Sequence, residues 1–149
     1  MCSIIRTGIN NIKRNNMEGE KRKILIVDDD SFLLDMYALK FSQNNFEVYT
    51  ASSGVQAIEK MRGGLKPDVM LMDIIMPEMD GFEMLAKINE EKLCPNCMRI
   101  VLSNKSQQSD IDEGNKLGVS GYIVKANSTP LEVINQVIDI LRKKAVIPK

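Results

Sequence analysis

The chain has 149 residues, enough for about one domain with a single sizeable core. It is 44% hydrophobic and 27% charged. Its 20 basic and 20 acidic residues cancel, so the overall charge gives no reason to expect nucleic acid or an anionic membrane as a partner. No apolar run approaches the roughly 20 residues that span a bilayer. Residues 1–16 lack the apolar stretch and the cleavage site of a secretory signal. We therefore expect a cytoplasmic protein without membrane contact.

The chain divides into three parts by pattern. Residues 1–22 are polar, rich in asparagine and without sustained periodicity, which predicts a flexible N-terminal extension. Over residues 23–144, short apolar runs alternate with helical segments, the pattern typical of a parallel α/β sheet. Residues 145–149 are left as a short tail, so we expect a single domain.

The elements follow one another as five strand–helix units. In chain order the pattern predicts strand 24–27, helix 31–44, strand 47–50, helix 54–62, strand 69–72, helix 81–90, strand 99–102, helix 109–117, strand 121–124 and helix 130–144. The last helix has the clearest signal, because Ile134, Val137, Ile138 and Leu141 form one apolar stripe at helical spacing.

The three cysteines, Cys2, Cys94 and Cys97, are an odd number and do not suggest a disulfide framework. Cys94 and Cys97 have metal-ligand spacing, but the chain has no histidine and no second cysteine pair to complete a zinc site. A redox motif would place the pair at the start of a helix after a strand, whereas here it lies between a predicted helix and the next strand. We interpret this pair as reduced thiols in a turn, with zinc shared between two chains as the alternative.

Polar side chains follow four of the predicted strands. Asp28, Asp29 and Asp30 follow the first strand, Asp73 the third, Ser103 and Asn104 the fourth, and Lys125 the fifth. In an open parallel sheet, ligands bind at the carboxyl ends of the strands. We therefore expect these residues to converge on one edge of the sheet.

This set of residues is suited to phosphoryl transfer. Crowded carboxylates need a cation between them, and Mg²⁺ prefers such oxygen ligands together with a phosphate. One carboxylate could act as the nucleophile toward phosphorus, while a lysine and a hydroxyl balance the charge of the transferred group. Taken singly, Asp28–Asp30 could cap a helix, Ser103 could be a turn residue and Lys125 a solvated charge. Asp73 has no obvious packing role, and the joint placement favours function.

The chain strongly resembles the receiver domain of two-component response regulators. The resemblance covers roughly residues 23–143 and rests on the motifs ILIVDDD, PDVMLMDIIMPEMDG, IVLSN and GYIVK in order. It implies a flavodoxin-like, three-layer (βα)5 fold with parallel sheet order 2-1-3-4-5. It also implies a Mg²⁺-dependent phosphoacceptor that is not an enzyme in the ordinary sense.

The resemblance also implies a role for each site residue. Asp73 matches the phosphoacceptor, and Asp28 and Asp29 match the acidic pair that binds Mg²⁺, with Asp29 as the more direct ligand. The backbone carbonyl of Ile75 matches a further metal contact. Ser103 and Tyr122 match the switch residues of the family. Lys125 matches the lysine that pairs with the phosphoryl group.

Partners follow from the same resemblance. A sensor histidine kinase or a histidine phosphotransfer protein would donate the phosphoryl group. An unknown downstream protein would read the face formed by segments 109–117, 121–124 and 130–144. A phosphorylation-dependent homodimer is a further option, and no nucleic-acid binding is expected.

Two positions depart from the usual pattern of the family, and a third bears on the lifetime of the phosphorylated state. Asn104 stands where a small residue is usual, and Ala126 stands where a proline with a cis peptide bond is usual. Because a cis bond before a non-proline residue costs about 3–4 kcal/mol, we expect the Lys125–Ala126 bond to be trans or else strained. Ile75 cannot hydrogen-bond an attacking water, which predicts a long-lived phosphorylated state.

Three alternatives compete with this interpretation. An aspartate-nucleophile phosphatase could use the Asp28-x-Asp30 pattern, but the residues after Lys125 lack a further acidic pair. A flavin-binding module would need a loop after the first strand that accepts a phosphate, and three aspartates would repel one. A degenerate receiver that only binds partners remains open if Asn104 and Ala126 disrupt the site.

Overall fold

The computed structural model describes residues 21–104, 107–125 and 128–146, with side chains of the last helix described to Lys143. Within these ranges strands and helices alternate. The strands are β1 (Arg22–Val27), β2 (Phe46–Ala51), β3 (Val69–Met72), β4 (Met98–Ser103) and β5 (Gly121–Val124). The helices are α2 (Ser31–Gln43), α3 (Gly54–Arg62), α4 (Gly81–Glu91), α5 (Gln108–Lys116) and α6 (Pro130–Val146).

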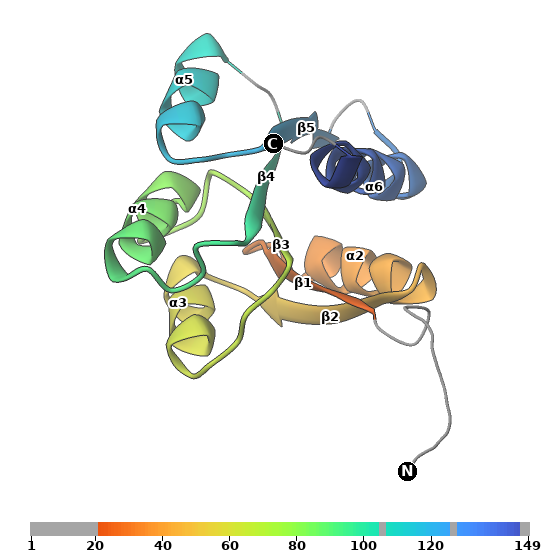
Figure 1. Cartoon of the computed structure of the whole chain (residues 1–149), viewed down its shortest axis with the longest axis horizontal. Coiled ribbons are helices and arrows are strands. Elements are labelled where there is room, and N and C mark those ends of the chain that lie inside the picture. Colours follow the sequence, from red (N-terminus) through yellow and green to blue (C-terminus); the bar gives the residue numbers. More distant parts are fainter. Residues whose placement is uncertain (1–20, 105–106, 126–127, 147–149) are drawn as a thin grey trace.

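The strands form one parallel sheet in the order β2-β1-β3-β4-β5. Figure 1 shows α2 and α6 on one face of this sheet and α3, α4 and α5 on the other. This arrangement confirms the expected flavodoxin-like, three-layer fold. The strand order reverses next to β1, so the carboxyl ends of β1 and β3 flank the place where such sheets bind ligands.

Two apolar layers hold the helices to the sheet. Because side chains alternate along a strand, Leu25 and Val27 of β1 pack in the layer beneath α3 and α4, while Ile24 and Ile26 pack in the layer beneath α2 and α6. All four are almost completely buried. A sheet covered on both faces explains why its strands are continuous apolar runs rather than alternating ones.

The predicted bounds agree with the observed ones to within two residues. β1 begins at Arg22, inside the range expected to precede the fold, because Arg22 pairs in register with Phe46. Helix α6 continues to Val146, into the expected tail. Residues 1–20 of the predicted flexible extension (residues 1–22) lie outside the described residues. None of the helices described is long and apolar enough to cross a membrane.

Candidate functional site

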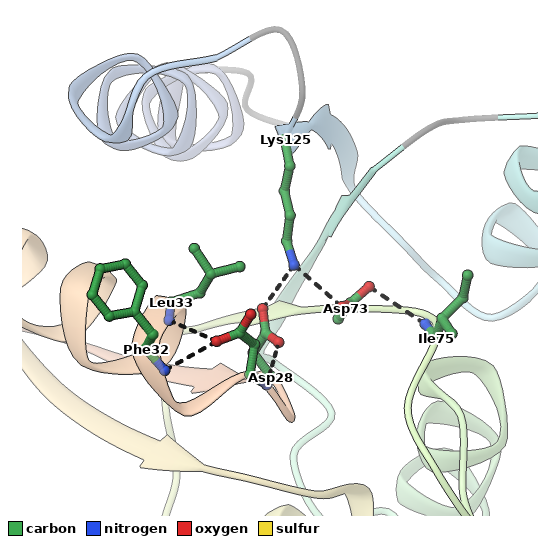
Figure 2. Close-up of polar contacts among 7 residues, drawn as sticks. Asp28, Phe32, Leu33, Asp73, Ile75 and Lys125 are labelled. Atoms are coloured by element: carbon green, nitrogen blue, oxygen red, sulfur yellow. Dashed lines mark hydrogen bonds and ion pairs between the residues drawn. The ribbon is translucent and has the colours of Figure 1, made fainter.

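Three charged side chains from three strand ends meet at the carboxyl edge of the sheet. The ammonium nitrogen of Lys125 lies 2.8 Å from Oδ2 of Asp28 and 3.2 Å from Oδ2 of Asp73. Figure 2 shows the lysine reaching across the sheet edge between the two carboxylates. Side-chain exposure is 10% for Lys125, 4% for Asp28 and 13% for Asp73, so the contacts are largely shielded from solvent.

The strand register places the two carboxylates side by side. Val27 of β1 pairs with Met72 of β3, so the next residues, Asp28 and Asp73, continue neighbouring strands. The Asp73 amide donates to the carbonyl oxygen of Val27 at 3.0 Å, and the Asp28 amide donates to the Ala51 carbonyl at 3.2 Å. The sheet ladder therefore extends one residue beyond the strands and fixes both acidic residues.

Asp29 brings a third carboxylate to the same place. One oxygen from each of Asp28, Asp29 and Asp73 lies within 4.8 Å of the other two. Asp28 is buried and Asp29 is exposed, with Asp73 between these extremes. A set of three carboxylates with one open side could hold a divalent cation that prefers oxygen ligands and keeps several waters, as Mg²⁺ does.

The charges at the site act on one another. Burial raises the pKa of Asp73, and the neighbouring Asp28 carboxylate raises it further, while Lys125 acts in the opposite direction. Burial lowers the pKa of Lys125, but the hydrogen bond to Asp28 and the charges of Asp73 and Asp28 outweigh this effect, so that pKa is raised. Lys125 is therefore held as a cation, and the crowded carboxylates favour an additional positive charge nearby.

Asp30 has a separate, structural task. One of its oxygens accepts hydrogen bonds from the amides of Phe32 at 3.0 Å and Leu33 at 3.2 Å, which makes it the N-cap of α2. Its own amide donates to Oδ1 of Asp28 at 2.9 Å and holds that carboxylate in place. The aspartate triplet therefore divides into Asp28 and Asp29, which face the site, and Asp30, which starts the helix.

The first residue of α4, Gly81, packs against the acceptor in a way that the sequence-based prediction missed. The Gly81 amide donates to the carbonyl oxygen of Ile74 at 2.7 Å, and a Cβ atom at Gly81 would collide with the carbonyl oxygen of Asp73. Asp80 caps α4 through a capping box with Glu83. The DGFE run carries this capping signal, but the close contact with Asp73 depends on tertiary packing.

The main chain of Ile75 lies beside the acceptor. Its amide points at Oδ1 of Asp73 (Figure 2), with the nitrogen 3.4 Å from that oxygen. The residue as a whole is 75% exposed. The predicted role of its carbonyl as a metal contact stays a prediction. The exposed position agrees with a side chain that could affect how solvent reaches Asp73.

The two expected switch residues lie on neighbouring strands. Ser103 is the last residue of β4, is buried, and pairs in register with Val124, the residue before Lys125. Tyr122 lies two residues before Val124 and is partly buried, with its hydroxyl donating to the carbonyl oxygen of Ile111 at 2.8 Å. The ring of Tyr122 packs against the core layer that includes Val101. The tyrosine is thus connected to α5 rather than directly to the acceptor.

Tyr37 is a second residue that the sequence did not single out. It is 3% exposed on α2, and the charges of Lys125 and Asp28 both act on its hydroxyl. Burial is the main reason why the pKa of Tyr37 is raised. Its helical spacing with Leu34 and Phe41 predicts that this tyrosine is a core residue. Nothing in the sequence pattern indicates that it also lies near the site.

The remaining predicted positions have mixed outcomes. Asn104 directly follows Ser103 and is exposed, so it does not fill the core behind the site. Ala126, and with it the predicted trans peptide bond, lies outside the described residues. Cys94 and Cys97 are buried free thiols in the connection between α4 and β4, as the interpretation of reduced thiols in a turn expects.

Solved structures share this architecture. Chemotaxis protein CheY4 of Vibrio cholerae matches with a TM-score of 0.75 and 25% identity, over 81% of this chain and 99% of that one. A CheY-like response regulator receiver domain protein of Methanospirillum hungatei also matches with a TM-score of 0.75 and 25% identity, over 85% and 98% of the two chains.

Curated proteins are similar in sequence. Chemotaxis protein CheY of Thermotoga maritima is 38% identical over 119 residues, which is 78% of this chain and 97% of that protein. The alkaline phosphatase synthesis transcriptional regulatory protein PhoP of Bacillus subtilis is 31% identical over 125 residues, and the match spans only half of PhoP. The family model of the response regulator receiver domain matches residues 24–138. The chain therefore belongs to the response regulator receiver domain family of two-component systems.

Proposed function

We propose that this receiver domain is the phosphoacceptor of a two-component phosphorelay and that Asp73 takes the phosphoryl group from a phosphohistidine. The donor would be a sensor histidine kinase or a histidine phosphotransfer protein. The observation that carries the proposal is the Lys125 ammonium held between Asp28 and Asp73, at 2.8 and 3.2 Å.

Asp73 is the acidic residue best suited to be the nucleophile. The Asp28 carboxylate already accepts from Lys125 and from the Asp30 amide, and its side chain is only 4% exposed. The Asp73 side chain is more exposed, at 13%, and one of its oxygens has only a long contact with the Ile75 amide. An oxygen of Asp73 would attack phosphorus, the P–N bond to histidine would break, and the imidazole would leave with the bonding electron pair.

The charge balance supports a cation at this site. Lys125 contacts two of the three clustered carboxylates, Asp28 and Asp73, so among the described residues of the cluster the negative charge exceeds the positive before a phosphoryl group arrives. Asp28, Asp29 and Asp73 fit Mg²⁺, with Asp29 as the exposed ligand and the Ile75 carbonyl as a further candidate. When bound, Mg²⁺ would neutralise part of the charge on the phosphoryl oxygens.

Lys125 and Ser103 would recognise the new phosphoryl group. Lys125 is close enough to Asp73 to move from its carboxylate to a phosphoryl oxygen without a large change in the chain. Ser103 ends the strand next to β5 and could donate its hydroxyl to the same group. Tyr122, two residues before Val124 on β5, would carry the change to α5 through its hydrogen bond to Ile111.

The output would be binding of another protein. The face formed by α5, β5 and α6 contains Tyr122 and borders the end of β5, so a shift at Ser103 or Lys125 would reach it first. A phosphorylation-dependent homodimer on this face remains an alternative. Nothing in the balanced charge of the chain favours nucleic acid as the direct partner.

The site disfavours an aspartate phosphatase built on the Asp28-x-Asp30 pattern. Such an enzyme needs Asp28 free to attack and Asp30 free to transfer protons, but Asp28 is buried against Lys125 and Asp30 caps α2. The alternative of a degenerate receiver is disfavoured by the joint presence of Asp28, Asp29, Asp73, Ser103 and Lys125.

The test is to incubate the protein with Mg²⁺ and a small phosphodonor such as acetyl phosphate and to map the modified residue by mass spectrometry. We expect an acyl phosphate on Asp73 that is absent from Asp73→Asn and that requires the divalent cation. Label that persists in Asp73→Asn, or steady hydrolysis of a generic phosphomonoester lost in Asp28→Asn, would contradict the proposal.

A further inference from the structure

The turn between α4 and β4 brings two thiols together at the end of the sheet opposite to Asp73. The four residues Cys94-Pro95-Asn96-Cys97 form a turn in which the Cys97 amide donates to the carbonyl oxygen of Cys94 at 3.2 Å. Proline is favoured at the second position of such a turn. The two cysteines are 4% and 6% exposed, and neither is used by the phosphoacceptor site.

The geometry of this turn suits a disulfide. A turn of this kind holds its first and last Cα atoms within about 7 Å, and a disulfide needs about 4.4–6.8 Å between them. The two thiols are near enough for each to shift the pKa of the other. In the reduced protein the Cys94 thiol donates to the carbonyl oxygen of Pro67 at 3.5 Å and the Cys97 thiol to that of Met98 at 3.4 Å, so both side chains have to rotate away from these carbonyls for the sulfurs to meet. Forming the S–S bond would therefore require little movement of the backbone.

A buried arginine lies against the same turn. Arg99 is 8% exposed, and its Nη2 donates to the carbonyl oxygen of Cys94 at 3.2 Å. In the part of the chain that the structure describes, the guanidinium forms no ion pair, and its buried Nε has no hydrogen-bond partner. A buried cation without an anion is costly, so the site favours a negative charge next to Arg99.

We propose that Cys94 and Cys97 form a redox-active dithiol, which hydrogen peroxide converts to an intramolecular disulfide and which dithiols reduce again. Cys94 is the attacking residue, and Arg99 is a positioning residue that stabilises its thiolate. The proposal concerns a modification site that is separate from Asp73 and does not depend on phosphorylation.

The charged groups around the turn support Cys94 as the nucleophile. The neighbouring Cys97 thiol and the positive charges of Lys66 and Arg99 lower the pKa of Cys94 to about 7, against burial and the charge of Asp68. The neighbouring Cys94 thiol, burial and the Cys94 charge raise the pKa of Cys97. One thiol is thus activated at neutral pH while the other stays protonated until it resolves the intermediate.

The chemistry has two steps. The Cys94 thiolate attacks one oxygen of the peroxide, the O–O bond breaks, and hydroxide leaves as water after taking up a proton, which forms a sulfenic acid. Cys97 then attacks the Cys94 sulfur, the S–O bond breaks, and the departing hydroxide takes the Cys97 proton to form a second water. Two thiols are oxidised and one peroxide is reduced to two waters.

The decisive experiment uses the full chain with Cys2→Ser, so that Cys94 and Cys97 are the only thiols. The native protein is treated with hydrogen peroxide, then blocked with an alkylating reagent, digested, and analysed by mass spectrometry. We expect the peptide that contains Cys94 and Cys97 to carry no alkyl group and to be two hydrogens lighter than its reduced form. When the oxidised protein is treated with dithiothreitol before alkylation, both cysteines should be fully alkylated. Two alkylated cysteines, a sulfinic acid without a disulfide, or a disulfide that forms only in denaturant would overturn the proposal.

Two variants test the assigned roles. Cys97→Ser should trap the Cys94 sulfenic acid, which reacts with dimedone, whereas Cys94→Ser should give no such adduct. Arg99→Gln should raise the pH at which Cys94 reaches half of its maximal alkylation rate, and Arg99→Lys should restore most of the difference. If Arg99→Gln folds and its pH midpoint is unchanged, the role assigned to Arg99 is wrong. If Arg99→Gln does not fold, the peroxide experiment on the Cys2→Ser protein, which keeps Arg99, still decides whether the disulfide forms.

Discussion

Lys125 and Asp28 are 97 positions apart in the chain, yet the ammonium of one lies 2.8 Å from a carboxylate oxygen of the other. The contact joins the end of β5 to the end of β1 across the end of β3, where Asp73 stands. A single lysine therefore compensates two carboxylates from the first and third strands, and the site depends on the whole sheet being assembled.

Removing this lysine should weaken the fold as well as the site. In Lys125→Met the carboxylates of Asp28 and Asp73 would face each other without an ammonium, and we expect the free energy of unfolding in EDTA to fall by about 1.5–3 kcal/mol. Mg²⁺ should restore part of the loss, because a cation would again lie among the carboxylates. Urea unfolding with and without Mg²⁺ measures both effects.

A double variant serves as the control for that prediction. Adding Asp73→Asn to Lys125→Met removes one of the two uncompensated charges, so the combined loss should be smaller than that of Lys125→Met alone. A loss equal to or larger than that of the single variant would contradict the charge explanation and point to lost packing of the lysine stem.

Replacing the acceptor by its neutral isostere should stabilise the metal-free protein. Burial and Asp28 raise the pKa of Asp73, so the folded protein binds this proton more tightly than the unfolded chain does. The stability contributed by the protonated form is therefore present below the unfolded pKa and is lost as the pH rises through the folded pKa. Asp73→Asn should then gain up to about 1 kcal/mol at neutral pH, in the range of a typical single-site effect.

The pH dependence separates this explanation from a general packing effect. The advantage of Asp73→Asn over the wild type should shrink as the pH falls through the raised pKa of folded Asp73. It should be gone below about pH 4, the ordinary pKa of an aspartate in the unfolded chain. Thermal unfolding in EDTA at several pH values measures it. An advantage that stays constant with pH would show that charge is not the cause.

Much of this site could be predicted from the sequence, because strand-end residues in a parallel sheet converge whatever their separation in the chain. That rule was sufficient to bring Asp28, Asp73 and Lys125 together. It could not reveal that Gly81 packs against the Asp73 carbonyl, or that Tyr37 lies within the field of Lys125 and Asp28. Those contacts depend on the path of a loop and on which side of α2 faces the site, and both are set by tertiary packing.

Asp30 and Asp28 should respond differently to substitution. Because Asp30 only caps α2, Asp30→Ser should keep the cap and leave phosphorylation of Asp73 unchanged, while Asp30→Ala should cost about 1 kcal/mol of stability. Labelling by acetyl phosphate and urea unfolding check the two effects separately. Loss of labelling in a stable Asp30→Ser protein would assign Asp30 a chemical role.

Gly114 is required by the position of Tyr122. A Cβ atom at Gly114 would collide with the tyrosine hydroxyl, lie 2.9 Å from its Cζ and lie 3.2 Å from Cγ2 of Val119. Gly114→Ala should therefore displace the ring, break its hydrogen bond to Ile111 and cost about 1–3 kcal/mol, as overpacked cores do.

A matched glycine provides the control. Gly63 has a helical φ of −78°, and a Cβ there would meet only backbone oxygens at 3.5 Å, so Gly63→Ala should be neutral or slightly stabilising. Tyr122→Phe should relieve part of the cost of Gly114→Ala by removing the hydroxyl. Equal unfolding free energies for Gly114→Ala and Gly63→Ala would contradict the assigned packing.

The lifetime of the phosphorylated state should depend on Ile75. The residue as a whole is 75% exposed, and its amide is 3.4 Å from Oδ1 of Asp73, so a polar group at this position could orient a water toward the phosphorus, whereas isoleucine cannot. After removal of the phosphodonor, we expect the acyl phosphate of Ile75→Asn to decay faster than that of the wild type, by up to about tenfold, which corresponds to about 1.4 kcal/mol of activation free energy. Ile75→Val keeps an apolar side chain and should decay at the wild-type rate. Equal decay in all three proteins would show that the side chain at position 75 does not control access of water to Asp73.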